Sequence, residues 1–305
     1  MENSQTGRRN FLKHAALLGA GLAPVAARNA KAAPDNVLSE DRMGVLVDTT
    51  LCIGCRSCEW ACKAAHELPT KPLHDYQDRS AFAERRRPDD RALTVVNEYD
   101  AGEKFPVYVK VQCMHCDRPS CVSACIVGAF SKQASGAVTW DSARCIGCRY
   151  CLVACPFQIP AFQYEEALRP DIVKCDFCFA RTDSGKLPAC VDVCPMEVLT
   201  YGPRGDLIKV ARERIRRDPE RYEPHIYGEY EAGGTSWLYL AGADFAKLEF
   251  PDVGSKPMPG TSEAIQHGIF AYFIPPVLLY ALLGSIMWIA RKRSESESEE
   301  PYEHP

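Results

Sequence analysis

The chain has 305 residues, of which 46% are hydrophobic and 25% are charged, and its formal net charge is −4. This acidic balance argues against nucleic acid as a partner, and the length alone allows one large domain or two small ones. Sixteen of the residues are cysteines, so the role of these thiols decides how the rest of the sequence is interpreted.

The first 32 residues have the pattern of an export signal. Arg8 and Arg9 stand just before Phe11, a weakly apolar stretch covers residues 15–27, and small residues surround Lys31. This order is typical of a twin-arginine signal peptide, so residues 1–32 are predicted to be removed and are left out of the expected fold. An ordinary secretory signal is the alternative.

The sixteen cysteines form four groups of four, and no cysteine lies outside a group. The first and third groups follow the spacing C-x2-C-x2-C-x3-C, the second widens one gap to four residues, and the fourth widens the same gap to eleven. Such spacing is typical of thiolates that bind 4Fe-4S clusters, and the inventory fits four clusters with none left over. The groups are Cys52, Cys55, Cys58, Cys62; Cys113, Cys116, Cys121, Cys125; Cys145, Cys148, Cys151, Cys155; and Cys175, Cys178, Cys190, Cys194.

Two other uses of the cysteines fit the spacing less well. A zinc ribbon needs two C-x2-C pairs for each metal, and the additional spacings here have no use in a tetrahedral site. A disulfide framework is common in exported chains, but cysteines two residues apart in tight loops are poorly placed to pair with one another. Twin-arginine export also fits clusters, because a protein that receives its clusters in the cytoplasm must cross the membrane already folded.

Strand and helix signals recur around each group. Short apolar runs at residues 44–47, 107–111, 137–140 and 172–173 are predicted strands that lead into the cysteine loops. The last cysteine of a group lies in a predicted turn or two of helix, as at residues 121–130 and 190–199. Residues 128–140 have the pattern of strand, turn and strand. Gly54 and Gly147 permit tight turns that point backbone N–H groups at the cluster sulfurs.

The groups resemble those of bacterial two-cluster ferredoxins, so we expect an α+β fold of two interleaved ferredoxin-like modules. The inner module covers residues 107–156, the outer module covers 33–106 and 157–203, and a C-terminal extension covers 204–263. In such ferredoxins the fourth cysteine of each run binds the other cluster. The ligand sets expected on this basis are Cys52, Cys55, Cys58 with Cys194; Cys62 with Cys175, Cys178, Cys190; Cys113, Cys116, Cys121 with Cys155; and Cys125 with Cys145, Cys148, Cys151.

Several other polar residues carry weaker signals. His115 lies between two cysteines, but four thiolates for each cluster make it a neighbour of the cluster or a surface residue rather than a ligand. The basic runs at residues 85–87 and 212–217 are expected to be solvated faces or subunit contacts, the second on a helix that begins near Asp206. His267 is expected to be an interfacial residue without a chemical role.

The C-terminal region has the pattern of a membrane anchor. Residues 268–290 are 23 residues without a charge, which make about 34 Å of helix and exceed a hydrocarbon core of about 30 Å. We therefore expect one transmembrane helix at 264–290, kinked at Pro275 and Pro276. Arg291, Lys292 and Arg293 place the tail, residues 291–305, in the cytoplasm and the body in the periplasm.

The chain resembles a known family, the four-cluster iron-sulfur subunits of respiratory molybdenum enzymes and nickel-iron hydrogenases. The resemblance rests on the cysteine groups and on residues 224–235, 237–242 and 262–267. With a twin-arginine signal on the subunit itself, it is most similar to the hydrogenase-2 type.

The resemblance implies a relay that is not itself an enzyme and that holds four 4Fe-4S clusters. Its partners would be the hydrogenase small and large subunits and a quinone-reactive membrane subunit, at the periplasmic face of the inner membrane. The sequence has no nucleotide-binding glycine loop and no nucleophile elbow. The beta subunit of a formate dehydrogenase or of another molybdenum oxidoreductase is one alternative, and a membrane-anchored ferredoxin-type redox sensor or store is another.

Overall fold

The computed structural model describes residues 42–102, 104–167, 170–260 and 274–297. The predicted signal peptide, residues 1–32, and His267 lie outside these residues. The chain divides into two compact units: residues 37–260, called the body below, and a unit made of the two terminal segments.

The largest sheet of the body has three strands. Strand β1 (Met43–Asp48) lies in the centre, β8 (Leu199–Pro203) pairs with it antiparallel, and β9 (Trp237–Leu240) pairs with it parallel. Successive side chains of each strand point to opposite faces of the sheet. Leu46 and Leu238 pack with helix α7, whereas Val45 and Trp237 belong to the main core that surrounds the cysteines.

Helix α7 (Arg204–Arg217) covers one face of this sheet. It buries Leu207 and Ala211, while the side chains of Arg216 and Arg217 are about three-quarters exposed, at 75% and 73%. The prediction of a helix here with a mainly solvated basic face is confirmed, and the helix begins at Arg204, near the expected Asp206. Its apolar stripe packs against β1, which precedes the first cysteine group, and it contacts β8, which follows the fourth group.

Three two-stranded sheets supply the other strands among the described residues. They are β2 (Val95–Tyr99) with β3 (Val107–Val111), β4 (Phe130–Lys132) with β5 (Val138–Trp140), and β6 (Ala161–Phe162) with β7 (Ile172–Val173). All three pairs are antiparallel. Strands β1, β3, β5 and β7 confirm the four predicted strands, and β4 with β5 confirms the predicted hairpin at residues 128–140.

Most of the helices that carry cysteines are only one turn long. They are α2 (Ser57–Ala65), α3 (Ser120–Ser123), α4 (Tyr150–Ala154) and α6 (Ala189–Asp192), and α5 (Phe179–Asp183) begins directly after Cys178. Short 3-10 helices cover Thr49–Leu51, Leu73–Gln77, Arg79–Phe82 and Glu231–Gly233. The helices predicted over 121–130 and 190–199 are therefore shorter than expected. Pro119 and Pro188 precede α3 and α6, and strands β4 and β8 take up the ends of the predicted ranges.

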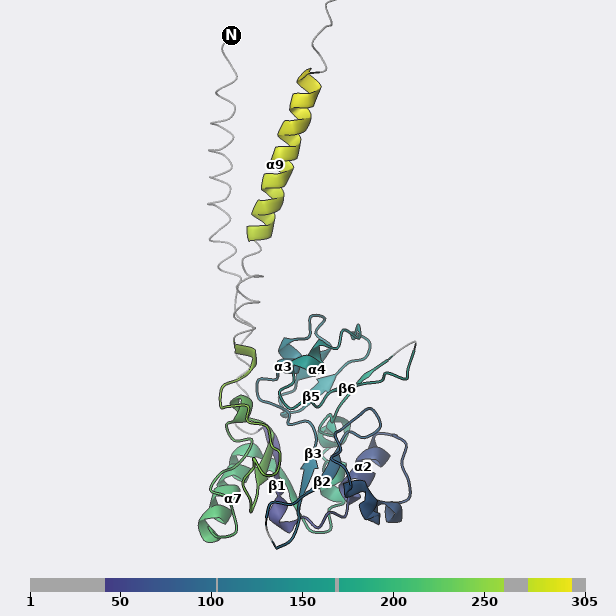
Figure 1. Ribbon diagram of the computed structural model, residues 1–305, viewed down its shortest axis with the longest axis vertical. Coiled ribbons are helices and arrows are strands. Elements are labelled where there is room, and N and C mark those ends of the chain that lie inside the picture. The colour runs from purple at the N-terminus through teal and green to yellow at the C-terminus, as the bar shows by residue number, and fades with distance from the viewer. Residues whose placement is uncertain (1–41, 103, 168–169, 261–273, 298–305) are drawn as a thin grey trace, which may run out of the picture. The chain divides into compact units, whose positions relative to one another are not determined.

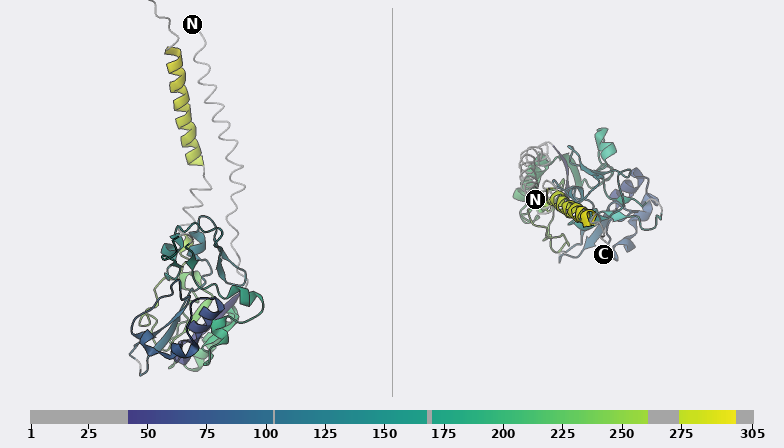
Figure 2. Two further views of the ribbon diagram at one scale, coloured as in Figure 1. Left: turned by 90° about the vertical axis from the view of Figure 1, so that its right-hand side faces the viewer. Right: turned by 90° about the horizontal axis from the view of Figure 1, so that it is seen from above.

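Segments far apart in the sequence pack together around the cysteines. Helix α2, from the first cysteine group, packs against α6, from the fourth, and α3, from the second group, packs against α4, from the third. In Figure 1, α3 and α4 lie together at one end of the body, with β1, β2, β3 and α2 toward the other end, and the turned view in Figure 2 shows the same division. The body thus has two regions, each built from two cysteine groups.

The basic run at residues 85–87 is solvated in part, as expected: Arg85 and Arg87 are exposed, but Arg86 is half-buried. Arg86 Nη2 donates to Glu59 Oε1 at 2.6 Å and to the Val96 carbonyl at 2.7 Å. Arg87 donates to the carbonyl oxygens of Phe157 and Gln158. These bonds fasten the polar insertion between the first two cysteine groups to the body.

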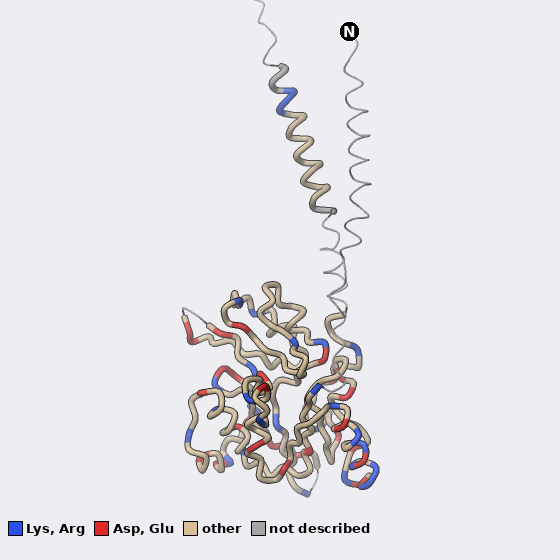
Figure 3. Tube along the Cα trace, turned by 180° about the vertical axis from the view of Figure 1, so that it is seen from behind, with Lys and Arg blue, Asp and Glu red and all other residues tan. Residues whose placement is uncertain are grey.

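In the second unit, helix α9 covers Ile274–Glu297. Pro275 and Pro276 lie in its first described turn, where proline is tolerated, and the helix continues through Arg291, Lys292 and Arg293, the basic stretch near its end in Figure 3. No helix of the described ranges combines the length and apolarity of a membrane span. The predicted transmembrane helix is therefore not supported here, and residues 264–273 of that segment lie outside the described residues.

Candidate metal centres

The sixteen cysteines all lie within the described residues, and none of them is paired in a disulfide. Fifteen are buried or partly buried, and only Cys148 is exposed. The disulfide alternative has no pair to support it. A function other than disulfide formation is therefore needed to explain so many free thiols inside one body.

One cavity in the body has four cysteines in its wall. Cys52, Cys55 and Cys58 come from the first group, and Cys194 is the last cysteine of the fourth group. Burial raises the pKa of Cys52 to about 11, and the thiolates of Cys55 and Cys194 add to this rise. The rest of the wall is mainly apolar, with Val47, Val198 and Leu199 among its side chains.

A second cavity repeats this arrangement with cysteines from the other two groups. Cys113, Cys116 and Cys121 of the second group line it together with Cys155, the last cysteine of the third. Burial raises the pKa of Cys116 well above its usual range, and the thiolates of Cys113, Cys155 and Cys121 raise it further. Again three cysteines of one run face the fourth cysteine of another.

The second and third groups share another set of neighbouring thiols. Burial raises the pKa of Cys151 to about 12, and the thiolates of Cys145, Cys148 and Cys125 contribute to the rise. Cys125 is the last cysteine of the second group, and its sulfur accepts the Ala129 N–H at 3.2 Å. This set lies at the exposed end of the cysteine array, because it includes Cys148.

The remaining four cysteines come from the first and fourth groups. Burial and the thiolates of Cys190 and Cys62 raise the pKa of Cys178 to about 11. Burial and the Cys62 thiolate also raise the pKa of Cys175 well above its usual range. Cys62, the last cysteine of the first group, therefore lies among the cysteines of the fourth.

These four sets fit a group that brings positive charge to several thiolates at once. Thiols with raised pKa values stay protonated on their own, because burial and mutual repulsion both disfavour the anions. Iron coordinated by sulfur reverses this balance, since a bound cation deprotonates its thiol ligands. The donor sets, with four sulfurs each and no carboxylate in the cavity walls described above, match the ligands of 4Fe-4S clusters.

Gly54 and Gly147 occupy the same place in the first and third cysteine loops. Their φ angles are +69° and +67°, in the left-handed region that favours glycine. The N–H of Gly54 donates to the Cys52 sulfur and lowers the pKa of this thiol in part, and the N–H of Gly147 lies 3.5 Å from the Cys145 sulfur. The predicted turns and their N–H groups are confirmed.

The two glycines differ in their surroundings, and this difference gives a matched test. A Cβ at Gly54 would lie 2.5 Å from Cδ1 of the buried Tyr108 ring, whereas at Gly147 the nearest atom within reach is Phe162 Cε2 at 3.7 Å. We expect Gly147→Ala to cost about 1–2 kcal/mol from backbone strain alone. Gly54→Ala should cost about 1–3 kcal/mol more from overpacking, measured as the free energy of unfolding. Equal losses in the two variants would contradict this account.

His115 is fully buried and is not the surface residue that the sequence allowed. Its Nδ1 accepts the Val138 N–H at 2.8 Å, so the neutral ring carries its proton on Nε2. Burial and the charges of Lys174, Lys132 and Lys110 lower the pKa of this imidazole. Nε2 has no hydrogen-bond partner among the described residues, and such a buried donor fits a cluster sulfur as its acceptor.

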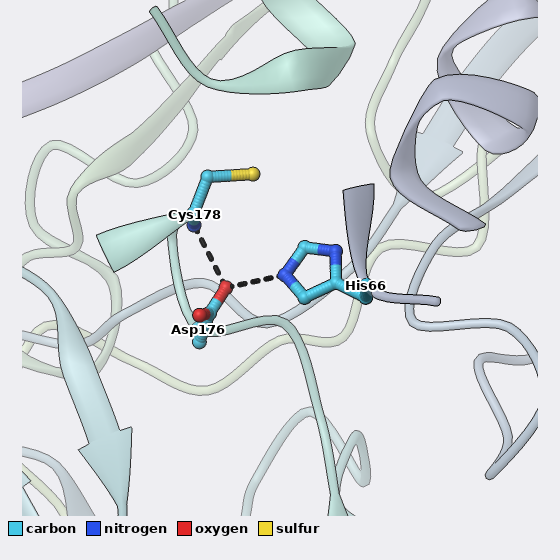
Figure 4. A group of neighbouring side chains, drawn as sticks. All are labelled: His66, Asp176 and Cys178. Atoms are coloured by element: carbon cyan, nitrogen blue, oxygen red, sulfur yellow. Dashed lines mark hydrogen bonds and ion pairs between the residues drawn. The ribbon is translucent and has the colours of Figure 1, made fainter. Parts of the chain in front are cut away.

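His66, Asp176 and Cys178 place potential metal-ligand atoms within 4.8 Å of one another. Figure 4 shows that Asp176 lies between the other two and accepts from both, from His66 Nε2 and from the Cys178 backbone N–H at 2.8 Å each. Burial alone would lower the pKa of His66, but the bonds to Asp176 and Cys62 raise it to about 11. We interpret these three residues as a hydrogen-bonded group that holds the Cys178 loop in place and not as a separate metal site, because the Cys178 thiol already belongs to a set of four cysteines.

Three lysines that were not expected at the site lie beside the thiols: Lys110, Lys132 and Lys174. Lys110 and Lys174 are 4% and 7% exposed. Lys132 donates to the carbonyls of His115 and Gly136, and burial lowers its pKa to about 8. The sequence did contain a signal, because Lys110 interrupts an apolar strand and Lys174 directly precedes Cys175.

Comparison with known proteins supports a family assignment for this arrangement. Two families described as "4Fe-4S dicluster domain" match the chain, one over residues 105–204 and the other over residues 51–129. The "Hydrogenase-2 operon protein HybA" of Escherichia coli O157:H7 is 31% identical over 330 residues, which cover 95% of this chain and 96% of the relative.

Two further relatives are subunits of other oxidoreductases. One subunit of the anaerobic dimethyl sulfoxide reductase of Escherichia coli strain K12 is 36% identical over 177 residues, 54% of this chain and 76% of the relative. The "Formate dehydrogenase, nitrate-inducible, iron-sulfur subunit" of the same strain is 30% identical over 198 residues, 64% of this chain and 66% of the relative. The expected resemblance and the two ferredoxin-like dicluster domains are thus confirmed.

Proposed function

Because this chain belongs to the family of iron-sulfur subunits of respiratory oxidoreductases and holds four 4Fe-4S clusters, we propose that it relays electrons from a nickel-iron hydrogenase to a quinone-reactive membrane subunit. The observation that carries the proposal is the match to the HybA protein over 95% of this chain and 96% of that relative. Each bound cluster supplies a site that takes up and releases an electron.

The four proposed ligand sets are those expected from the cysteine spacing. Cys52, Cys55, Cys58 with Cys194, and Cys113, Cys116, Cys121 with Cys155, each line one cavity, which supports these two sets. The electrostatic coupling among thiols supports the other two, Cys125 with Cys145, Cys148, Cys151, and Cys62 with Cys175, Cys178, Cys190. The crossing ties the second group to the third and the first to the fourth.

We propose that an electron-transfer partner docks where the set of Cys145, Cys148 and Cys151 reaches the surface. Exposed apolar side chains accompany the exposed Cys148, with Val153 of helix α4 at 86% and Ile126 at 73%. Exposed apolar residues around a functional site mark interaction surfaces. The exposed end of the array is a point where electrons can enter or leave the body.

Copurification from detergent extracts tests the assignment of the partner. The hydrogenase proposal expects nickel-iron hydrogenase small and large subunits in the purified complex. A molybdenum-containing formate dehydrogenase subunit in their place would favour the alternative partner, which the relative covering 64% of this chain supports. Purification without any catalytic subunit would argue against the relay and for a ferredoxin-type sensor or store.

We also propose export by the twin-arginine route and anchoring at residues 264–290, with the body at the periplasmic face of the inner membrane. Arg8 and Arg9 support the first part, and the uncharged run at residues 268–290 followed by Arg291, Lys292 and Arg293 supports the second.

Replacement of both Arg8 and Arg9 by lysine is expected to leave the precursor in the cytoplasm, because lysine keeps the charge but lacks the guanidinium geometry. Cell fractionation measures the distribution of the chain. Lysine substitution at Arg28 is the matched control and should leave export unchanged. Normal delivery of the double variant to the periplasm would contradict the assignment of the signal.

A further inference from the structure

Lys110 is a lysine inside the body whose partners are all uncharged side chains or thiols. It lies on strand β3, is 4% exposed, and its Nζ donates to Thr94 Oγ1 at 2.8 Å and to Gln112 Oε1 at 2.9 Å. The ammonium also lies 4.5 Å from the centre of the Trp237 ring. No ion pair found among the described residues joins Lys110 to a carboxylate.

A buried ammonium without a carboxylate needs another source of negative charge, because burying an unpaired charge is costly. Burial on its own would lower the pKa of Lys110, but the thiolates of Cys190, Cys58 and Cys175 raise it above its usual range. Lys110 also lies in the wall of the cavity that Cys52, Cys55, Cys58 and Cys194 line, so its side chain adjoins one of the proposed cluster sites.

The three thiolates belong to two different ligand sets. Cys58 is in the set completed by Cys194, and Cys175 and Cys190 are in the set completed by Cys62, according to the proposed function on which this inference rests. Along the sequence, the strand that carries Lys110, β3, follows the first cysteine group and precedes the fourth.

We propose that the Lys110 ammonium is a fixed positive charge shared by the two clusters of the outer module, and that it raises the reduction potentials of both. A cluster with four thiolate ligands is an anion, and gaining one electron makes it more negative. A buried cation stabilises the reduced form more than the oxidised form, because the interaction grows with the charge. Lys110 keeps its protons in the oxidised and the reduced state of the clusters, and it acts on their reduction potentials only through its positive charge.

Lys174 gives an internal comparison within the same protein. Lys174 is also buried, and it donates to the carbonyls of Val138 and Cys175. Burial raises the pKa of Cys121 to about 12, and the charge of Lys174 offsets part of this rise. Cys121 belongs to the set completed by Cys155, in the inner module. The charge of Lys174 should therefore act on a cluster of the inner module, whereas the charge of Lys110 should act on the outer pair.

The test is a redox titration of the purified complex, followed by electron paramagnetic resonance of the reduced clusters. Lys110→Met should lower two of the four reduction steps by about tenfold in equilibrium constant, about 59 mV for one electron, and leave two unchanged. Lys110→Arg should keep all four steps near their original potentials. Lys174→Met should lower the potential of a reduction step that Lys110→Met leaves unchanged. Lys209→Met changes an exposed lysine on α7 and should shift none of the four potentials.

The outcomes separate this inference from the function on which it rests. A wild-type chain without four clusters would remove the proposed function, whereas four clusters with unshifted potentials in Lys110→Met would overturn only the role of Lys110. Should Lys110→Met lose iron, Lys110→Gln and Lys110→Arg decide the matter by their iron content. Retention in the arginine variant with loss in both neutral variants supports the charge, and loss in the arginine variant as well would overturn it.

Discussion

Replacement of Cys155 by alanine is expected to remove the cluster bound by Cys113, Cys116 and Cys121, and to spare the cluster bound by the other cysteines of its own run. The reason is that Cys155 lies in the wall of the cavity lined by those three thiols. A cubane that loses one of four thiolates is lost or converted to a three-iron form, which electron paramagnetic resonance distinguishes from an intact cluster.

The matched control for this experiment is Cys148→Ala, in the same run. It should remove or convert a different cluster, the one that Cys145, Cys151 and Cys125 also bind. Loss of the same spectroscopic signal in both variants would show that the run binds one cluster by itself, and the crossed ligand sets would then be wrong.

Replacement of Glu59 by alanine is expected to be among the most destabilising changes that leave every cysteine in place. The carboxylate is 2% exposed and accepts from Arg86 at 2.6 and 3.1 Å, from Arg56 at 3.2 Å and from the Val96 N–H at 2.6 Å. Its loss leaves two partly buried guanidinium groups without their counter-ion. Breaking a buried pair in this way costs about 3–5 kcal/mol.

Thermal unfolding of the cluster-loaded chain measures this effect, with loss of visible absorption as a second signal. Glu213→Ala is the control, because Glu213 is 47% exposed and pairs with Arg216 on the surface of helix α7. An exposed pair is worth about 0–1 kcal/mol. Similar unfolding temperatures for the two variants would show that Glu59 does not hold the Arg86 insertion and the first cysteine loop together.

The cysteine spacing and the strands before each group could be predicted from the sequence because both are local patterns. The repeated Gly54 and Gly147 turns are local in the same sense, and the structure gives them the expected positive φ angles. The sequence pattern overestimates the short helices, since proline before α3 and α6 and the following strands limit their length.

What the sequence did not reveal depends on contacts between distant segments. Glu59 and Arg86 are 27 residues apart, and no periodic pattern marks them as partners. Lys110 shares a cavity wall with cysteines of the first and fourth groups, so its environment exists only after the chain has folded. Charge alone assigns basic residues near cysteine runs to the surface, whereas the fold places three lysines among the thiols.

The metal and sulfide content of the purified chain shows whether it carries electrons through four 4Fe-4S clusters. Sixteen cysteines in sets of four predict about sixteen iron atoms and about sixteen acid-labile sulfides for each chain after anaerobic purification. Iron, zinc and sulfide are measured on the same sample, with the protein quantified by amino-acid analysis. Stoichiometric zinc with little sulfide would contradict the account, because zinc binds thiolates without inorganic sulfide.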